Sequence, residues 1–252
     1  KNFEPNIEDL KSKSSNRTKG IIINSPSNPT GSVWSDEATL NVLSLAKENN
    51  WVVISDECYE RLVFDGEFTS AQKLNIDNNI GANIITCMSM SKTYSMTGWR
   101  IGYAFGEEKI IKAMSKIQGQ ATSCANSISQ SASVEALTGD QSAVELMRNK
   151  FKERRNLMVS LLNEIPGTQC DLPGGAFYAF PDFSYYLGKS FNNVKIKDSF
   201  DLSDLFLNEA QVVTVPGDGF GAPGHIRFSY PVSGDLIRKG LKRIKNILEK
   251  LI

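Results

Sequence analysis

Four short apolar runs near the start of the chain predict β-strands. The first, GIIIN at residues 20–24, is continuous and β-branched, which is typical of a buried parallel strand. It runs into the proline-containing loop 25–31, which we expect at the carboxyl end of that strand. The other three runs occupy residues 51–55, 83–88 and 100–105.

A helical pattern separates the first two of these runs. Ser35 stands at the start of a helix that continues to about Asn49, with Leu40, Leu43 and Ala46 on one broad apolar face. Strands and helices joined by short connections predict an α/β fold with a mostly parallel sheet flanked by helices. Ligands of such sheets bind beyond the carboxyl ends of the strands.

The pattern changes in the second half of the chain. Helical segments are expected from residue 108 to about 137, and a long amphipathic helix then ends before Pro166, with apolar positions at Val144, Met147, Phe151, Met158 and Leu162. Short strands are expected at residues 177–180, 212–215 and 226–230, and helices at 202–210 and 236–251. We therefore expect a large domain at residues 1–144 and a smaller α+β domain at residues 145–252.

Composition argues against several classes of partner. The 252 residues include 28 basic and 28 acidic side chains, so no net field attracts nucleic acid or an anionic membrane. No apolar stretch approaches the ~20 residues that span a bilayer, and the polar start lacks the apolar core of a secretory signal. We expect a cytoplasmic protein that binds neither nucleic acid nor membrane.

The cysteines and the histidine do not suggest a metal site. Cys58, Cys87, Cys124 and Cys170 are widely separated, without a C-x-x-C spacing, and His225 is the only histidine. We expect reduced cysteines and no bound metal. A structural role is expected for His225, because its neighbours offer no nucleophile for a Ser–His or Cys–His hydrolase.

The stretch SMSKTYSMTGWR, from Ser89 to Arg100, carries the most informative chemistry in the sequence. Lys92 follows a predicted strand, and a desolvated lysine amine loses its proton and condenses with an aldehyde to form a Schiff base. The hydroxyls of Ser89 and Ser91 and the fork of Arg100 suit a phosphate, which a pyridoxal cofactor carries at its other end. A solvated lysine in a polar loop is the alternative.

Asp56 and Tyr59 follow the second predicted strand. The Asp56 carboxylate could keep the pyridine nitrogen of such a cofactor protonated, which makes the ring a better electron sink. Tyr59 could donate a hydrogen bond to the phenolate oxygen of the same ring. A helix cap is an equally simple role for Asp56.

Asn28 and Arg227 are further candidates from distant parts of the chain. Asn28, in the sequence NPTG, could hydrogen-bond the phenolate oxygen, although NPTG is also typical of an ordinary turn. Arg227 alternates with apolar neighbours on a predicted strand, where it could clamp a carboxylate through two hydrogen bonds or simply face solvent.

Residues 219–224 (GFGAPG) match the dinucleotide fingerprint G-x-G-x-x-G. Pro223 lies inside the match, and a predicted strand follows it where the fingerprint requires a helix N-terminus for the pyrophosphate. We therefore expect a tight connection here, not a dinucleotide site.

Taken together, these residues resemble the class I/II aminotransferases, in particular the aspartate-aminotransferase-like group of fold type I pyridoxal-phosphate enzymes. The resemblance covers nearly the whole chain and rests, in family order, on residues 28–31, Asp56 with Tyr59, Ser89 to Lys92, residues 97–102, residues 173–177 and residues 226–229. It implies pyridoxal 5′-phosphate as the cofactor, amino acids and 2-oxo acids as substrates, and a homodimer.

The resemblance also implies a role for each candidate residue. Lys92 would form the Schiff base and move the proton of the substrate α-carbon, and Asp56 would pair with the pyridinium nitrogen. The remaining roles fall to Asn28 and Tyr59 at the phenolate oxygen, Ser89, Ser91 and Arg100 at the phosphate, and Arg227 with Asn28 at the substrate.

Family members carry a long segment before the position equivalent to Lys1, which supplies the first strands of the sheet and part of the site. We expect the pyridoxal-phosphate-dependent transferase fold without those strands. A lyase or cyclopropane-forming synthase of the same fold, or a cofactor-binding fragment without turnover, are the alternatives to an aminotransferase. The residues at hand do not define side-chain specificity.

Overall fold

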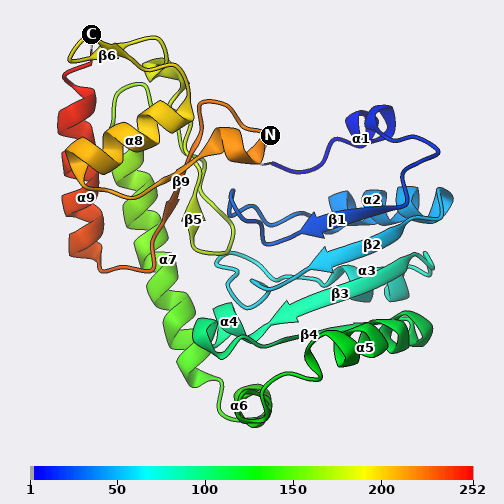
Figure 1. Cartoon of the computed structure of the whole chain (residues 1–252). Helices are drawn as coiled ribbons and strands as arrows, with labels where there is room; N and C mark the ends of the chain where they lie inside the picture. Colours follow the sequence, from blue (N-terminus) through cyan, green and yellow to red (C-terminus); the bar gives the residue numbers. More distant parts are fainter. Residues whose placement is uncertain (1–2, 252) are drawn as a thin grey trace. The chain divides into compact units, whose positions relative to one another are not determined.

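A computed structural model describes residues 3–251 of the chain. Its contacts divide the chain into two compact units (Figure 1). The first unit comprises Lys1–Ser27 and Ser32–Leu146, and the second comprises Asn28–Gly31 and Met147–Ile252. The short loop Asn28–Gly31 thus groups with residues far from it in sequence.

The first unit is built on a four-stranded sheet with the order β1-β2-β3-β4. The strands are β1 (Gly20–Asn24), β2 (Val52–Asp56), β3 (Asn83–Ser89) and β4 (Gly102–Gly106). The first three are parallel, and β4 pairs antiparallel with β3. The predicted α/β fold with a mostly parallel sheet is therefore confirmed.

Helices accompany this sheet, and all of them except α5 begin at a residue whose side chain caps the helix. They are α1 (Ile7–Lys13), α2 (Asp36–Glu48), α3 (Ala71–Asp77), α4 (Met90–Thr93), α5 (Glu108–Thr122) and α6 (Ser127–Thr138), with a 3₁₀ turn η1 (Thr97–Trp99). The Ser35 hydroxyl accepts a hydrogen bond from the Ala38 N–H at 3.2 Å, as predicted for the start of α2.

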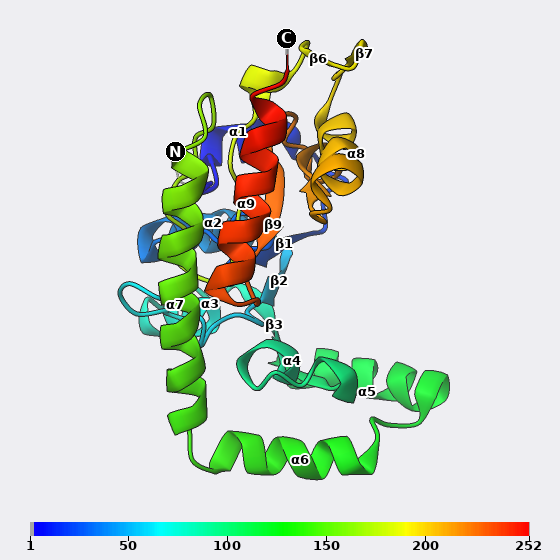
Figure 2. The same ribbon diagram turned by 90° about the vertical axis from the view of Figure 1, so that its left-hand side faces the viewer.

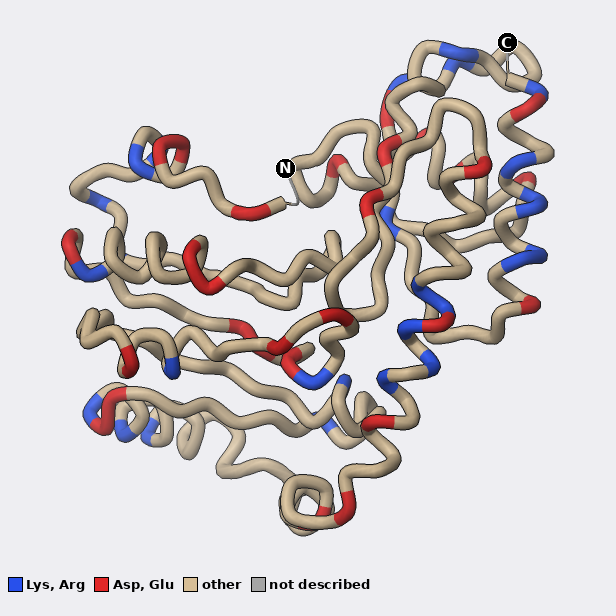
Figure 3. The backbone as a smooth tube through the Cα atoms, turned by 180° about the vertical axis from the view of Figure 1, so that it is seen from behind, with Lys and Arg blue, Asp and Glu red and all other residues tan. Residues whose placement is uncertain are grey.

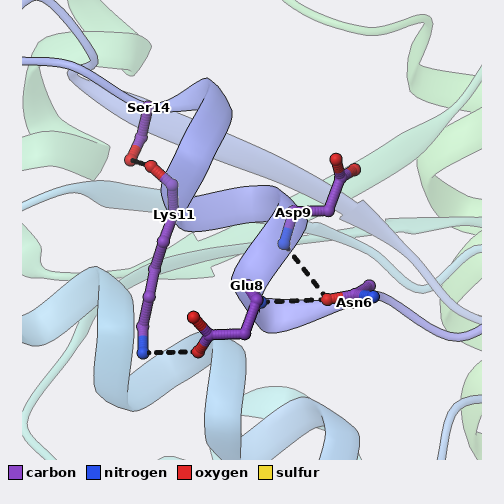
Figure 4. Close-up of polar contacts among 5 residues, drawn as sticks. All are labelled: Asn6, Glu8, Asp9, Lys11 and Ser14. Atoms are coloured by element: carbon purple, nitrogen blue, oxygen red, sulfur yellow. Dashed lines mark hydrogen bonds and ion pairs between the residues drawn. The ribbon is translucent and has the colours of Figure 1, made fainter.

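The helix α1, which the sequence analysis did not predict, begins at a side-chain cap (Figure 4). The Asn6 side-chain oxygen accepts hydrogen bonds from the N–H groups of Glu8 and Asp9 at 3.0 and 3.1 Å. Lys11 forms an ion pair with Glu8 one turn earlier, at 2.9 Å. These local contacts stabilise a helix of only two turns, which buries none of its residues.

The core of the first unit lies on one face of the sheet only. Ile23, Val53 and Ile84 pack into a buried cluster with α2, whereas Ile22 on the opposite face of β1 is 71% exposed. Strand 20–24 is parallel as predicted, but its predicted burial holds for only one face in the part of the chain described here. In a strand, successive side chains point to opposite faces, and α2 and α3 cover just one of them.

The second unit has a small antiparallel sheet with the order β5-β9-β8. Its elements are α7 (Ser142–Asn163, which begins in the first unit), β5 (Tyr178–Ala179), η2 (Ser184–Tyr186), β6 (Ser190–Phe191), β7 (Val194–Lys195), α8 (Ser199–Ala210), β8 (Val215–Pro216), η3 (Gly217–Phe220), β9 (Ile226–Ser229) and α9 (Gly234–Leu248). Figure 2 shows α8 and α9 side by side.

The strand predicted at residues 212–215 is shorter than expected, because only Val215 of that range pairs in the sheet. The cause lies at the end of α8. Gln211 adopts a left-handed conformation there, and the Val212 N–H turns back to donate to the Phe206 carbonyl at 3.0 Å.

Two asparagine side chains, each near a helix end, form two hydrogen bonds with the backbone of the residue seven positions later; we call each such pair of bonds an asparagine clip. In the first unit Asn75 accepts from the Ala82 N–H at 2.9 Å and donates to its carbonyl at 3.1 Å. In the second unit Asn163 does the same with Cys170, at 2.8 and 3.0 Å. Each amide thus acts as a substitute for one residue of a paired strand.

Charged residues of both signs are spread along the chain (Figure 3). Within residues 3–251, no helix combines the length and the apolar character that crossing a bilayer would require.

Candidate active site

Polar residues cluster where the parallel strands of the first unit end. In the sheet register Asn24 of β1 stands beside Asp56 of β2, and Asp56 stands beside Cys87 of β3. The strand β3 continues for two residues beyond Cys87 and leads directly into α4, which carries Lys92. The parallel alignment therefore delivers Asp56 and Lys92 to the same edge of the sheet.

Lys92 lies against the ring of Tyr59. Its ammonium nitrogen is 5.8 Å from the ring centroid, within the range of a cation–π contact. Tyr59 is buried and Lys92 is half-buried. The Ser89 hydroxyl caps the short helix by accepting from the Ser91 N–H at 3.1 Å, which fixes the start of the turn that presents Lys92.

Asp56 ends β2 and bonds to Cys58, two residues later. Its Oδ1 accepts from the Cys58 N–H at 3.3 Å, and the carboxylate also bonds with the Cys58 side chain. The bonded N–H belongs to the turn after β2 and not to a helix, so Asp56 is not the helix cap considered from the sequence. These contacts hold the carboxylate at the carboxyl end of β2.

The Cys58 thiol interacts electrostatically with both Asp56 and Lys92. Burial above all, together with the Asp56 carboxylate, raises the pKa of the Cys58 thiol to about 12, while Lys92 acts in the opposite direction. The thiol is accordingly protonated near neutral pH and is a poor nucleophile.

Glu57 is a residue that sequence reasoning missed. It is only 2% exposed, and its Oε1 accepts hydrogen bonds from the Ser55 and Ser70 hydroxyls and the Ala71 N–H, at 2.9, 3.1 and 3.0 Å. Burial is the main cause that raises its pKa. Glu57 connects the end of β2 to the start of α3. Its donors Ser70 and Ala71 are 13 and 14 residues away, so no local sequence pattern predicts these bonds.

Arg100 lies outside β4, although the sequence predicted a strand from this residue onward. Its φ of 51° is left-handed, and its Nη1 donates to the Thr97 carbonyl at 2.8 Å, so the extended conformation starts only at Gly102. Gly102 pairs with Ser89 across the β3–β4 ladder. The sheet therefore holds the backbone near Arg100 close to Ser89.

These side chains fit a bound phosphate. The Ser91 hydroxyl, the Ser89 hydroxyl proton and the other N–H groups of Arg100 have no hydrogen-bond partner among the described residues. Hydroxyl protons and guanidinium N–H groups that are still available are donors of the kind that a phosphate dianion accepts.

An open cavity of about 1230 Å³ borders Arg100 on the side of β4, α5 and α6. Apolar side chains such as Trp99, Met114 and Ile128 contribute to its walls. Lys92 and Asp56 do not line it, so the cavity adjoins the polar cluster only at Arg100.

The second unit places Asn28 and Arg227 together although they are 199 residues apart in sequence. Arg227 Nη1 donates to Asn28 Oδ1 at 2.7 Å. An amide that accepts through Oδ1 directs its donors to the Nδ2 side. Arg227 is half-buried, which differs from a side chain that simply faces solvent.

The loop that carries Asn28 is fixed by Gly31. Gly31 has a φ of +67°, and a Cβ there would lie 2.5 Å from the Pro173 side chain and 2.8 Å from the Tyr178 carbonyl. The Gly31 carbonyl accepts from the Gly175 N–H at 2.9 Å. The sequence motifs NPTG (residues 28–31) and PGGAF (residues 173–177) therefore contact each other.

Comparison with known proteins shows the family of the chain. The family model described as aminotransferase class I and II matches residues 1–244. The chain belongs to this family, whose members depend on pyridoxal 5′-phosphate.

Individual relatives are aspartate aminotransferases. The chain is 41% identical to the probable aspartate/prephenate aminotransferase of Aquifex aeolicus, over 100% of this chain and 62% of that protein. It is 38% identical to the aspartate aminotransferase of Bacillus subtilis, over 98% of this chain and 62% of that protein. The chain thus spans about three fifths of the length of these curated relatives.

The fold is shared with solved structures. The crystal structure of the aspartate aminotransferase from Rhizobium meliloti superimposes with a TM-score of 0.93 at 38% identity, covering 99% of this chain and 63% of that chain. The described residues therefore have the α/β fold of the pyridoxal-phosphate-dependent aspartate aminotransferases, as the sequence resemblance implied.

Proposed function

We propose that this protein is an aminotransferase that moves an amino group from an amino acid to a 2-oxo acid. The presentation of Lys92 and Asp56 at the same edge of the parallel sheet carries the proposal. Because the named relatives are aspartate aminotransferases, aspartate is the first amino donor to test. Their names favour transfer over the lyase or synthase chemistry of the same fold.

Pyridoxal 5′-phosphate, when bound, supplies an aldehyde and a ring that withdraws electrons from the reacting carbon. We assign its phosphate to Ser89, Ser91 and Arg100, which keep further donors beyond the Arg100 contact with the Thr97 carbonyl. The Asp56 carboxylate would accept from the pyridinium N–H of the bound cofactor and would keep that proton on the nitrogen. Tyr59 and Asn28 are assigned to the phenolate oxygen.

Lys92 performs the proton transfer. Its amine is the base that removes the proton from the substrate α-carbon and returns a proton during the second half of the reaction. Its position over the Tyr59 ring, on a short helix capped by Ser89, restricts where the amine can reach.

Arg227 binds the substrate α-carboxylate. A guanidinium offers two parallel N–H donors to a carboxylate, which sets the orientation of the substrate as well as its affinity. The hydrogen bond to Asn28 leaves further guanidinium N–H groups for this purpose.

The test uses Lys92→Ala and Lys92→Arg variants with aspartate and 2-oxoglutarate as substrates. Loss of the catalytic base lowers kcat by about 10²- to 10⁴-fold, and arginine does not restore it because its guanidinium keeps its proton. Glutamate formation is followed by chromatography. Borohydride trapping followed by peptide mass spectrometry finds the cofactor on the peptide that contains Lys92.

The matched control is Lys73→Ala, which removes an exposed lysine that pairs only with Asp77 on α3. It keeps wild-type turnover. If Lys92→Ala kept turnover, or if the trapped cofactor were found on another lysine, the assignment of Lys92 would be wrong.

We further propose that the protein acts as a homodimer, as is usual in this family, with amino acids and 2-oxo acids as its ligands. Light scattering of the purified protein tests the assembly. A monomer that turns over aspartate would contradict it.

A further inference from the structure

The guanidinium of Arg227 is enclosed by two aromatic rings of the second unit. Its Cζ lies 4.8 Å from the centroid of the Tyr178 ring and 5.3 Å from that of Phe220. Both distances are within the range of cation–π attraction. With the Asn28 contact, three side chains thus converge on one guanidinium.

The two rings come from elements that are themselves held in place. Tyr178 is buried on β5, where its backbone pairs with Ser229 of β9, and its ring packs on Phe177 at 4.8 Å. It therefore offers a rigid aromatic wall beside Arg227, which is on the paired strand β9.

Phe220 depends on a loop that is anchored to α8. The Asp218 carboxylate in η3 accepts from the Ser199 N–H at 3.1 Å and from the Ser199 hydroxyl, and the Asp218 N–H donates to that hydroxyl at 3.0 Å. The Phe220 ring also meets Phe180 edge-on at 6.1 Å. These contacts fix an aromatic side chain that is otherwise partly exposed.

Glycines in and just before residues 219–224, the stretch that matches the dinucleotide fingerprint, shape this loop. Gly221 and Gly224 have φ values of +73° and +79°, and a Cβ on Gly224 would lie 2.1 Å from the Ser184 hydroxyl. Gly217 allows the Ala222 and His225 carbonyls to approach within 2.5 Å of where its Cβ would lie. The motif thus builds a compact turn that presents Phe220.

We propose that Tyr178 and Phe220 are positioning residues, which hold the plane and direction of the Arg227 guanidinium for the incoming carboxylate. A free arginine side chain samples many rotamers, and fixing it on binding costs conformational entropy. Two rings that restrict it before binding reduce this cost. The inference rests on the proposed role of Arg227 in the aminotransferase.

The first measurement does not depend on catalysis. Nitrogen-15 NMR of the protein detects the Arg227 side-chain N–H, which is assigned by its loss in Arg227→Lys. Ring currents from the two nearby rings displace this resonance upfield. The variants Tyr178→Leu and Phe220→Leu each remove part of the displacement, whereas Tyr178→Phe and Phe220→Tyr retain it.

The second measurement is kinetic, with 2-oxoglutarate and aspartate. Each leucine variant raises KM about tenfold, which corresponds to a cation–π contribution of about 1.4 kcal/mol, and changes kcat less than about threefold. The ring-retaining variants restore KM. Tyr185→Leu is the matched control, since it removes the 4.4 Å contact of Lys189 with a ring elsewhere in the second unit.

The outcomes separate the inference from the proposed function. Unchanged resonance and KM in the leucine variants would overturn the positioning role, as would an equal rise in KM in Tyr185→Leu. A displaced Arg227 resonance that responds to both rings, in a wild-type protein without transamination, would refute the function and leave the geometric role of the rings supported.

Discussion

Replacement of Glu57 tests whether the buried carboxylate organises the end of β2. Glu57→Ala removes one acceptor from three donors, the two serine hydroxyls and the Ala71 N–H. At about 1 kcal/mol for each hydrogen bond, the free energy of unfolding falls by about 3 kcal/mol at pH 5. Glu57→Gln keeps the accepting oxygen, so its loss stays within about 1 kcal/mol at the same pH.

The difference in stability between the wild type and Glu57→Gln changes with pH in a defined direction. The folded state raises the pKa of Glu57 above 4.5, chiefly through burial, so folding favours the protonated carboxyl. The stability of the wild type relative to Glu57→Gln is therefore greatest below about pH 4.5 and falls as the pH rises through the folded-state pKa. Each unit of elevation amounts to about 1.4 kcal/mol.

Urea unfolding followed by tryptophan fluorescence provides the assay. All three tryptophans, Trp34, Trp51 and Trp99, belong to the first unit, so the signal reports on the unit that contains Glu57. Glu67→Ala, at an exposed position nearby, is the control with little effect. The reasoning is refuted if Glu57→Ala costs less than about 1 kcal/mol, or if the wild type gains stability over Glu57→Gln as the pH rises.

Three shorter predictions concern other features. Asn163→Ala removes both hydrogen bonds of its clip and lowers the unfolding free energy by about 2 kcal/mol in urea titrations monitored by circular dichroism. Gly31→Ala lowers the melting temperature because of its φ of +67° and its close neighbours, whereas Gly119→Ala, in open space on α5, raises it by favouring the helix. Iodoacetamide at pH 8 modifies the exposed Cys124 before Cys58, whose pKa is about 12; mass spectrometry that found Cys58 alkylated first would contradict this.

The strands that carry the site were predictable because their signals are local. Residues 20–24 and 83–88 are apolar runs bounded by polar turns, and β1 and β3 occupy almost the same positions. The start of β4 was misplaced because the left-handed conformation of Arg100 interrupts an otherwise strand-like run. The short helix α3 was missed, although Ser70 caps it locally; the bond from the Ala71 N–H to the distant Glu57 carboxylate is not visible in the sequence.

The candidate site was predictable as a set of residue types, but not as a set of contacts. A lysine among hydroxyls after a strand is visible in the sequence, and so is Arg227 between apolar neighbours. The pairing of Arg227 with Asn28 joins residues 199 positions apart, and the ring of Phe220 lies near Arg227 in a turn where Asp218 bonds Ser199. Such relations follow from the folded backbone alone.

The two asparagine clips have a consequence for hydrogen exchange. The N–H groups of Ala82 and Cys170 are bonded to side-chain amides and not to a strand or helix ladder. Their rates of deuterium uptake are therefore set by the release of one side chain at the end of α3 or α7. These two amides form natural probes, one in each unit, that distinguish fraying of a helix end from opening of a sheet.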